Sequence, residues 1–378
     1  MKTLFFLFIF ISLVVAVFSY GFTDPNLVLL KHPFFVSIQG MLHQLVYAHT
    51  GTAALITGSI LITFFVLYIG VLRLQEKATK EERKKFIKLF IIIGIILLLS
   101  YPMFSYDVFN YILTAKLTYF WKENPYVVMP IEISNDPNLM FTRAANKLAL
   151  YGPTWISATF LPSLVGFGNV WLSIIAFKVL VGAWYGIFLW MIYRFTKTLW
   201  NVVFFALNPL ILSEVFINGH NDILMMVLSL GGLLLWQNMQ PKYRYLGFMS
   251  FVASIFVKGA SIVLIPLFFL RWPMDKILSA GFWLMFGVLL LTPIREEMYP
   301  WYAVWVLTFA ALIPKNKAKF IHSFSIVLSF GLLMRHLPYI VTREYGGVGP
   351  LWRLLLTAVP VVVYLFFRFL KSISRKDM

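Results

Sequence analysis

Residues 51–103 read GTAALITGSILITFFVLYIGVL (51–72), RLQEKATKEERKK (73–85) and FIKLFIIIGIILLLSYPM (86–103), so two apolar runs flank a basic segment. A helix needs roughly 20 apolar residues to cross about 30 Å of hydrocarbon, and residues 51–72 supply them without a single charge. Loops rich in Lys and Arg remain on the cytoplasmic side of a membrane. The stretch therefore predicts two membrane-spanning helices joined by a cytoplasmic loop.

The composition of the whole chain also indicates a membrane protein. Of its 378 residues, 60% are hydrophobic and 12% are charged, about half the charged fraction of an average soluble domain. This excludes a water-soluble globule and a disordered chain. The absence of Cys excludes disulfides, thiolate nucleophiles, Cys-ligated zinc and iron–sulfur clusters. A net charge of +17 also occurs in nucleic-acid-binding proteins, but the basic residues lie between apolar runs, so we expect no nucleic-acid partner.

Further apolar runs predict an all-α, polytopic integral membrane protein with about eleven to thirteen transmembrane helices in a single domain over residues 1–378. The clear candidate spans are 3–20, 51–72, 86–103, 171–193 and 350–370. The shorter or interrupted candidates are 153–167, 199–216, 222–239, 245–270, 277–292, 302–314 and 320–334. The first span resembles a signal peptide, but no convincing cleavage pattern follows it, so we expect a retained anchor.

The basic loops set the expected topology. The positive-inside rule places the following clusters in the cytoplasm: 73–88, Arg194/Lys197, Lys242/Arg244, Arg271/Lys276, Lys315/Lys317/Lys319 and Lys371/Arg375/Lys376. Residues 104–152 then form the main external loop, which we expect to carry short interfacial helices. The same parity requires 153–167 to be a partial span or re-entrant, and 245–270 to be a hairpin of two half-length helices around Lys258.

The chain has 15 acidic residues, so each can be considered in turn. Most lie in loops, where solvated charge is the default interpretation, including Glu76, Glu344 and Asp377. Five lie at apolar boundaries, where a carboxylate is costly and is a functional candidate. They are Asp107, Glu214, Asp222, Glu296 and Glu297.

Asp107 lies in the string Ser105–Tyr111 (SYDVFNY), at the expected outer mouth of a helix and among aromatic residues. Desolvation there predicts a raised pKa, which suits a general base that takes a proton from a hydroxyl group. The alternative is an N-cap for a helix over 108–120, because Asp caps helices well.

Asp222 ends a second polar string, Asn218-Gly219-His220-Asn221-Asp222, which follows Glu214 and precedes an apolar helix. Polar groups at a helix N-terminus can bind a phosphate or a sugar, whereas an elaborate cap is the plainer interpretation. His220 and Asp222 alone are weak signals for a metal.

Cationic and aromatic residues complete the set of candidates. Lys258 interrupts an apolar stretch and needs a counter-charge, for which a bound phosphate is one partner and snorkelling the alternative. The string from Arg295 to Tyr302 (REEMYPWY) marks another expected external mouth, where Trp and Tyr either line the membrane interface or stack on sugars. Arg335, His336, Arg343 and Arg353 add external positive charge.

The motifs together resemble the GT-C glycosyltransferases, integral membrane enzymes that use polyprenyl-phosphate sugars as donors. The order resembles the polyprenol-phosphate-mannose-dependent α-1,6-mannosyltransferases, over about residues 100 to 310. The motifs are SYDVFNY at 105–111, NPY at 124–126, YGP at 151–153, NPL at 208–210, GHND at 219–222, Lys258 and PWY at 300–302.

The resemblance implies a GT-C-like fold, with Asp107 as the base and 104–152 as the catalytic loop. The implied donor-phosphate ligands are Lys258, His220, Arg295, Arg335 and Arg353. The implied sugar or acceptor ligands are Tyr106, Asn110, Tyr126, Tyr151, Glu214, Asn218, Asn221, Asp222, Trp301 and Tyr302. No metal or other cofactor is expected, because the lipid-linked donor is itself a substrate and no Asp-x-Asp motif is present.

The expected reaction transfers a sugar, mannose first, from a polyprenyl phosphate to a hydroxyl of a glycan or glycolipid acceptor with inversion, at the external face of the cell membrane. A transporter or flippase is the alternative from another class, because paired broken helices with charged residues also occur in transporters. A GT-C enzyme for another lipid-linked sugar and a structural scaffold are further alternatives, although a scaffold does not explain the polar motifs.

Overall fold

The computed structural model describes residues 1–27, 29–75, 80–133, 135–166, 168–237, 240–343 and 349–374. Part of the basic segment at 76–79 and the residues Glu344, Arg375, Lys376 and Asp377 lie outside these ranges. The described residues form helices, turns and loops without a strand, which confirms the all-α prediction.

Helices account for most of the chain from end to end. The N-terminal half contains α1 Lys2–Ser19, α2 Pro33–Ala48, α3 Thr50–Leu74, α4 Lys80–Leu98, α5 Asp107–Tyr119, α6 Pro153–Ala158, α7 Phe160–Gly166 and α8 Val170–Thr196. The middle contains α9 Leu199–Ala206, α10 Pro209–Ile211, η5 Leu212–Ile217, α11 Asp222–Trp236, α12 Pro241–Ile255, η6 Gly259–Leu264 and α13 Ile265–Phe269. The C-terminal part contains α14 Met274–Leu291, η7 Thr292–Ile294, η8 Pro300–Tyr302, α15 Ala303–Leu312, α16 Lys319–Met334, α17 His336–Thr342 and α18 Gly349–Ser374. Three short 3-10 turns complete the list: η1 Tyr20–Phe22, η3 Pro130–Glu132 and η4 Pro137–Phe141.

Six helical segments in the described ranges are long and apolar enough to cross a membrane, or seven if one bent pair counts as a span. They are Lys2–Phe22, Thr50–Leu74, Val170–Thr196, Met274–Ile294, Lys319–Thr342 and Gly349–Ser374. Apolar residues form helices in lipid because each backbone N–H and C=O must be paired within its own segment. The predicted total of eleven to thirteen is not confirmed. Several remaining apolar helices are too short, since 15 residues of α11 extend only about 22 Å.

The predicted span 86–103 has different limits in the structure. Its helix, α4, begins at Lys80 and ends at Leu98. The chain then turns through Ser100 and Pro102, where the Lys178 side chain of α8 donates to the Leu97 carbonyl at 3.0 Å and to the Ser100 carbonyl at 2.5 Å. A cation at the C-terminal end of a helix satisfies its unpaired carbonyls and its dipole, which fixes where α4 stops.

The two segments expected to be broken are both broken. Within the predicted segment 153–167, the described residues 153–166 form the short helices α6 and α7, neither long enough to span. Lys258 lies between α12 and the η6–α13 pair, which fold back on each other. Phe251 and Phe268 stack with ring centroids 4.4 Å apart, and the Ser254 and Ser261 hydroxyls are 3.0 Å apart. The predicted hairpin around Lys258 is therefore present.

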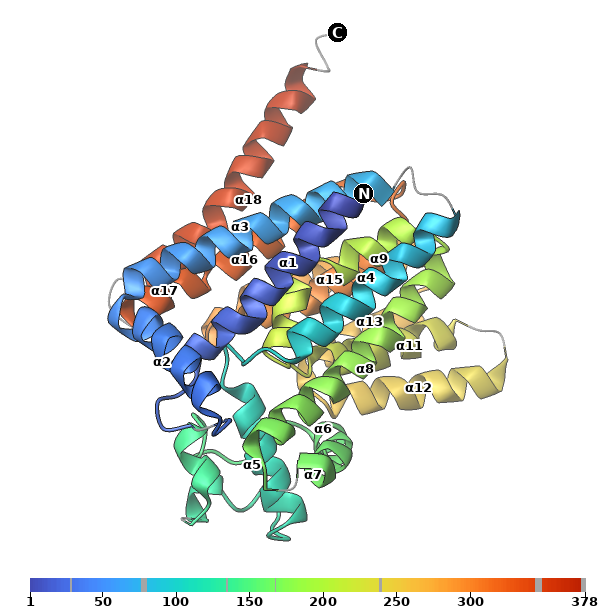
Figure 1. Ribbon diagram of the computed structural model, residues 1–378. Coiled ribbons are helices and arrows are strands. Elements are labelled where there is room, and N and C mark those ends of the chain that lie inside the picture. The colour runs from blue at the N-terminus through green and yellow to red at the C-terminus, as the bar shows by residue number, and fades with distance from the viewer. Residues whose placement is uncertain are drawn as a thin grey trace.

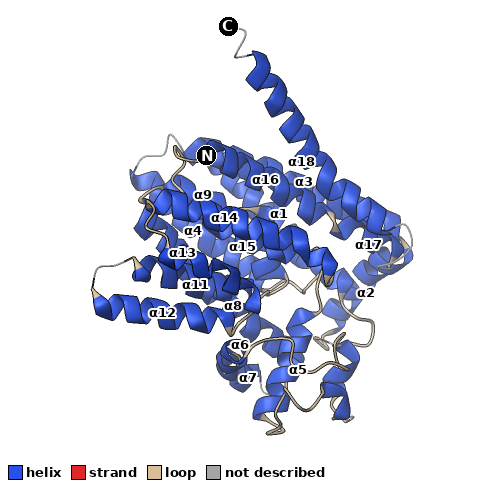
Figure 2. Ribbon diagram, turned by 180° about the vertical axis from the view of Figure 1, so that it is seen from behind, coloured by secondary structure: helices blue, strands red, loops and turns tan. Residues whose placement is uncertain are grey.

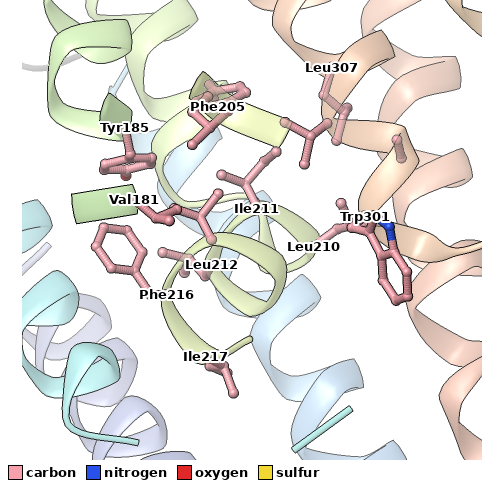
Figure 3. Close-up of a cluster of buried hydrophobic side chains, with 14 of the residues drawn as sticks. Val181, Tyr185, Phe205, Leu210, Ile211, Leu212, Phe216, Ile217, Trp301 and Leu307 are labelled. Carbon is pink, nitrogen blue, oxygen red and sulfur yellow. The ribbon is translucent and has the colours of Figure 1, made fainter. Parts of the chain in front are cut away.

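The predicted span 199–216 is bent by 51° between α9 and the α10–η5 segment. Asn208-Pro209 interrupts the helix, because Pro lacks the backbone donor that a helix interior needs. The chain then continues as the π-helix η5, which carries Glu214. Figure 3 shows the apolar side chains of α10 and η5 packed with Val181 and Tyr185 of α8 and Phe205 of α9. The polar residues of η5, Ser213 and Glu214, are therefore buried as well.

The helices form one bundle whose two ends differ (Figures 1 and 2). α5, α6 and α7, with the loops between α5 and α6, gather at one end of the bundle. The C-terminal end of α3 and the N-terminal end of α4 lie at the opposite end, as does the N-terminus. The described residues of the loop 104–152 and of the basic segment 73–88, which the sequence assigned to opposite faces, are thus at opposite ends. α18 packs against α16 through its first half and then extends away from the bundle.

Candidate active site

The polar residues of five separate segments meet beside the loop end of the bundle. Asp107 is the first residue of α5, and its backbone N–H donates to Ser105 Oγ at 3.2 Å. The N-cap position of α5 is occupied by Tyr106, and no side-chain capping bond forms there. Asp107 Oδ2 lies 3.4 Å from Nδ1 of His220, and the Asp107 side chain is 22% exposed. The N-cap interpretation of Asp107 is therefore wrong.

His220 is fully buried in the short loop between η5 and α11. Gly219 precedes it with a φ of +73°, a left-handed conformation that glycine adopts without strain and that turns the chain toward α5. One ring nitrogen faces Asp107, and the other, Nε2, lies 3.3 Å from Glu214 Oε2. The ring stacks on Trp301, with centroids 4.1 Å apart. His220 thus bridges two carboxylates against an aromatic wall.

The charges around Asp107 correct the predicted direction of its pKa. Burial alone would raise the pKa of Asp107, but the contact with His220, the charge of Lys258 and a hydrogen bond with Tyr151 outweigh it and lower that pKa. Burial alone would likewise lower the pKa of His220, but Asp107 and Glu214 raise it to about 9. The two residues form an ion pair at neutral pH.

Glu214 is fully buried and has partners on both carboxylate oxygens. Oε2 accepts a hydrogen bond from Asn218 Nδ2 at 2.9 Å besides facing His220, and Oε1 lies 3.3 Å from Nε2 of His336. Asn218 also accepts from the backbone N–H of Phe104, and the Phe104 ring stacks on His336 at 4.2 Å. These contacts join η5 to α17 and to the segment that leads into α5.

A second ion pair lies beside the first. Lys258 Nζ donates to both oxygens of Asp222, at 2.9 and 2.8 Å, and Trp305 Nε1 donates to the same carboxylate at 2.6 Å. Asp222 is buried, whereas the Lys258 side chain is 15% exposed. Tyr302 stacks on Trp305, and Lys258 Nζ lies 5.5 Å from the centroid of the Tyr302 ring. The counter-charge that Lys258 needs is therefore supplied by Asp222.

A third group of residues lines a small pocket next to these pairs. Arg335 and Arg353 are both buried. Arg335 contacts Oε1 of Glu297, and Nη1 of Arg353 lies 2.9 Å from Oε2 of the same carboxylate. Arg335 also donates to Thr357 Oγ1 at 3.0 Å. Trp301 and His336 line the same pocket, and each also contacts the His220–Glu214 pair. The pocket therefore joins the arginines to the Asp107 cluster.

Several predicted ligands present buried polar atoms that have no hydrogen-bond partner among the described residues. They are both side-chain amide atoms of Asn221, Asn110 Oδ1, Trp301 Nε1 and the two ring nitrogens of His220, which face carboxylates at ion-pair distance without hydrogen-bond geometry. Buried polar groups are almost always paired in a complete structure, so the amide and indole atoms suit a polar ligand such as a sugar. Asn221 also donates its backbone N–H to the Tyr111 hydroxyl at 3.4 Å. Tyr151 packs edge-on against Tyr111 at 4.7 Å.

Three predicted site residues lie apart from this cluster or have other roles. Arg295 is exposed and makes no ion pair within the described ranges. The Tyr126 hydroxyl donates to the Tyr151 carbonyl at 2.9 Å, which fixes the loop. Tyr106 lies under the Arg143 guanidinium, 4.7 Å from its ring centroid. No three His, Asp or Glu side chains of the described chain are placed to hold a metal ion. The expectation of a metal-free reaction stays a prediction.

Two residues of this region were not selected as site residues from the sequence. His336 was interpreted as part of the external positive charge, but it contacts Glu214. Lys178 is fully buried within the apolar run of α8 and was not considered. A charged residue inside a transmembrane run is a functional candidate by default, so a census of bases, like that of acids, would have found Lys178.

The sequence matches the family described as alpha-(1->6)-mannopyranosyltransferase, N-terminal domain, over residues 8–274. The chain belongs to this family. No curated protein and no solved structure matches the sequence. The protein is therefore a membrane mannosyltransferase, and of the enzyme and transporter interpretations the family supports the enzyme. The matched region of the mannosyltransferase contains Asp107, Glu214, His220 and Lys258, whereas Glu297 and the two arginines lie beyond it.

Proposed function

We propose that the protein transfers mannose from a polyprenyl-phosphate donor to a hydroxyl of a glycan or glycolipid, with Asp107 as the general base. The observation that carries the proposal is the position of Asp107. Its carboxylate is partly open, while the histidine that orients it is fully buried. A base must reach the proton that it takes and must be ionised, and the lowered pKa of Asp107 meets the second requirement at neutral pH.

In the proposed reaction, Asp107 accepts the proton of the acceptor hydroxyl while that oxygen attacks C1 of mannose. The bond between C1 and the phosphate oxygen breaks, and its electron pair leaves with the polyprenyl phosphate. Attack from the side opposite the leaving group inverts C1, so a β-linked donor gives an α-mannoside. No redox partner is required.

The leaving phosphate gains negative charge as the bond breaks, so fixed cations stabilise the transition state most. Arg335 and Arg353 are the best-placed candidates, because both line an open pocket and phosphate binds guanidinium groups as carboxylate does. Lys258 is a weaker candidate than the sequence suggested, since it faces the Asp222 carboxylate one to one, whereas the two arginines share the single carboxylate of Glu297. The unpaired amide of Asn221 and the indole of Trp301 are candidates for the mannose hydroxyls.

The test uses purified protein in detergent or nanodiscs, radiolabelled polyprenyl-phosphate mannose and a panel of glycan and glycolipid acceptors. We expect transfer by the wild type and a loss of about 10³-fold or more in Asp107→Asn, the upper range for a general base. Asp275→Asn is the matched control, because Asp275 starts α14 and pairs loosely with Lys317 at 3.7 Å. Full activity in Asp107→Asn would remove Asp107 from the mechanism.

The proposed external position of the site is tested separately. Because the chain has no Cys, a single introduced cysteine reports its own side of the membrane. Glu123→Cys, in the exposed loop after α5, should react with an impermeant thiol reagent in intact cells. Arg83→Cys, exposed near the start of α4, should react only after permeabilisation. The reverse pattern would place the site in the cytoplasm.

A further inference from the structure

Glu214 has the contacts of a residue that supports the site, although the sequence suggested that it binds a sugar. It is fully buried, and its two oxygens contact His220, Asn218 and His336. A buried carboxylate is costly unless it is paired and hydrogen-bonded, and these three neighbours meet that need. No part of Glu214 is left to reach a substrate.

His220 receives a carboxylate at each ring nitrogen. Asp107 Oδ2 lies 3.4 Å from Nδ1, and Glu214 Oε2 lies 3.3 Å from Nε2. These are ion-pair distances, and two ionised carboxylates so close to the ring favour its cationic form, in which both nitrogens carry a proton. A neutral ring would turn one lone pair toward a carboxylate. The stack on Trp301 also favours the cationic ring, because an aromatic face attracts positive charge.

We propose that Glu214 is a positioning residue, which keeps the His220 ring cationic and directed at Asp107 so that the base is held in place with its counter-charge. The inference rests on the proposed function with Asp107 as the base. A phosphate-bearing donor must approach Asp107, and like charges repel. An imidazolium beside the carboxylate offsets that repulsion.

The other charged and titratable groups around His220 do not replace Glu214. Tyr151 hydrogen-bonds Asp107, and Lys258 acts on Asp107 from a distance while paired with Asp222. His336 contacts Glu214 and not His220. Of the described groups, only Asp107 and Glu214 contact the ring nitrogens, so removal of the Glu214 charge halves the negative charge that holds the ring protonated.

The experiment compares the wild type with Glu214→Gln, which keeps shape and removes charge. We measure kcat and KM for polyprenyl-phosphate mannose between about pH 6 and pH 9. In the wild type, kcat/KM should stay level until near pH 9. In Glu214→Gln it should match the wild type within about threefold at pH 6 and fall at least about tenfold by pH 8.5, chiefly through KM, because each pH unit above a pKa lowers the protonated fraction tenfold.

Two further variants separate positioning from general structural support. Glu214→Asp keeps the charge one methylene shorter and should retain the level profile, even at a lower kcat. Asp275→Asn, in the first turn of α14 and outside the site, is the control for loss of a carboxylate charge and should leave the profile unchanged. An equal loss at every pH in Glu214→Gln would indicate structural support only and would overturn the inference, as would an unchanged profile.

A direct measurement keeps the inference testable apart from activity. The chain has six His, so isotope-labelled histidine gives few side-chain NMR signals, and His220→Gln identifies that of His220. The His220 ring should stay protonated to about pH 9 in the wild type and lose its proton at least about 1.5 units lower in Glu214→Gln. An unchanged titration overturns the inference even if transfer is seen. An absence of transfer at any pH overturns the proposed function instead.

Discussion

The Lys258–Asp222 pair gives the sharpest test of the site, because its two partners differ in burial. Removing Lys258 leaves a buried charge unpaired, whereas removing Asp222 leaves a charge that is partly exposed. Lys258→Met removes both contacts, at 2.8 and 2.9 Å, and leaves a buried carboxylate with Trp305 as its remaining donor. Breaking a buried ion pair from one side costs about 3–5 kcal/mol. We expect a loss of about 3 kcal/mol in the free energy of unfolding, the lower limit, because Trp305 still donates.

Asp222→Asn should cost less. The Lys258 side chain is 15% exposed and can carry its charge toward water along a flexible stem, so the loss should be about 1–2 kcal/mol. In the double variant no buried charge remains unpaired. Its total loss should fall about 2 kcal/mol short of the sum of the single losses, the coupling expected of a direct contact.

The assay is reversible denaturation in detergent micelles at neutral pH, with exposed Lys276→Met as the control. Single effects that add within about 0.5 kcal/mol would refute the pair, since independent sites behave in that way. Mannosyl transfer by the same proteins decides the role of Lys258. A double variant that regains stability but not activity assigns Lys258 to the substrate, and one that regains both makes the pair purely structural.

Three further predictions concern the segments that hold the site together. Gly152→Ala should lower the melting temperature and the transfer rate, because an added Cβ would lie 2.1 Å from the Phe256 carbonyl oxygen. The backbone there cannot easily move away, since the Gly152 N–H donates to the Val257 carbonyl at 3.1 Å. Gly186→Ala, with open space around it, is the control and should leave both unchanged. Lys178→Met should cost about 1–3 kcal/mol in denaturation experiments, because it leaves the Ser100 carbonyl buried without a donor, whereas the Leu97 carbonyl still accepts from Ser100; a loss under about 0.5 kcal/mol would contradict the capping role. Stability should also decrease as pH rises from about 6.5, the ordinary pKa of histidine, through about 9, the pKa of His220 in the folded protein. A group with a raised folded pKa stabilises below its unfolded pKa and loses that contribution above its folded pKa, so melting temperatures at pH 6 and pH 9.5 should differ more in the wild type than in His220→Gln.

The fold class could be predicted because charge is scarce in this chain. With 12% charged residues, long uncharged runs identify the helices in lipid without any tertiary information. The total of spans could not be predicted in this way. Hydropathy alone does not separate a full crossing such as α3 from a short buried helix such as α15, because both are uniformly apolar.

The site was predictable as a set of residues and not as a set of contacts. Asp107, His220 and Asp222 were selected because polar residues at apolar boundaries are conspicuous. Their partners depend on packing between segments far apart in the sequence. Lys258 pairs with a residue 36 positions away, and Arg335 with Glu297, 38 positions away. The predicted pKa of Asp107 had the wrong direction for the same reason, since burial was visible in the sequence and the opposing His220 was not.

The π-helix η5 makes the length of this segment as important as its composition. Asn218 N–H pairs with the Ser213 carbonyl, five residues back, so this hydrogen-bonded turn contains one more residue than an α-helical turn. Deleting one residue between 212 and 217 would restore ordinary α-helical bonding, and the chain beyond would keep nearly the same orientation, because the wide turn absorbs the extra residue. Inserting a residue would instead rotate everything beyond by about 100° relative to α9. His220 and Asp222 would then face away from α5. Homologous chains that keep this site should therefore tolerate substitutions in η5, and the loss of its extra residue, far better than a single-residue insertion.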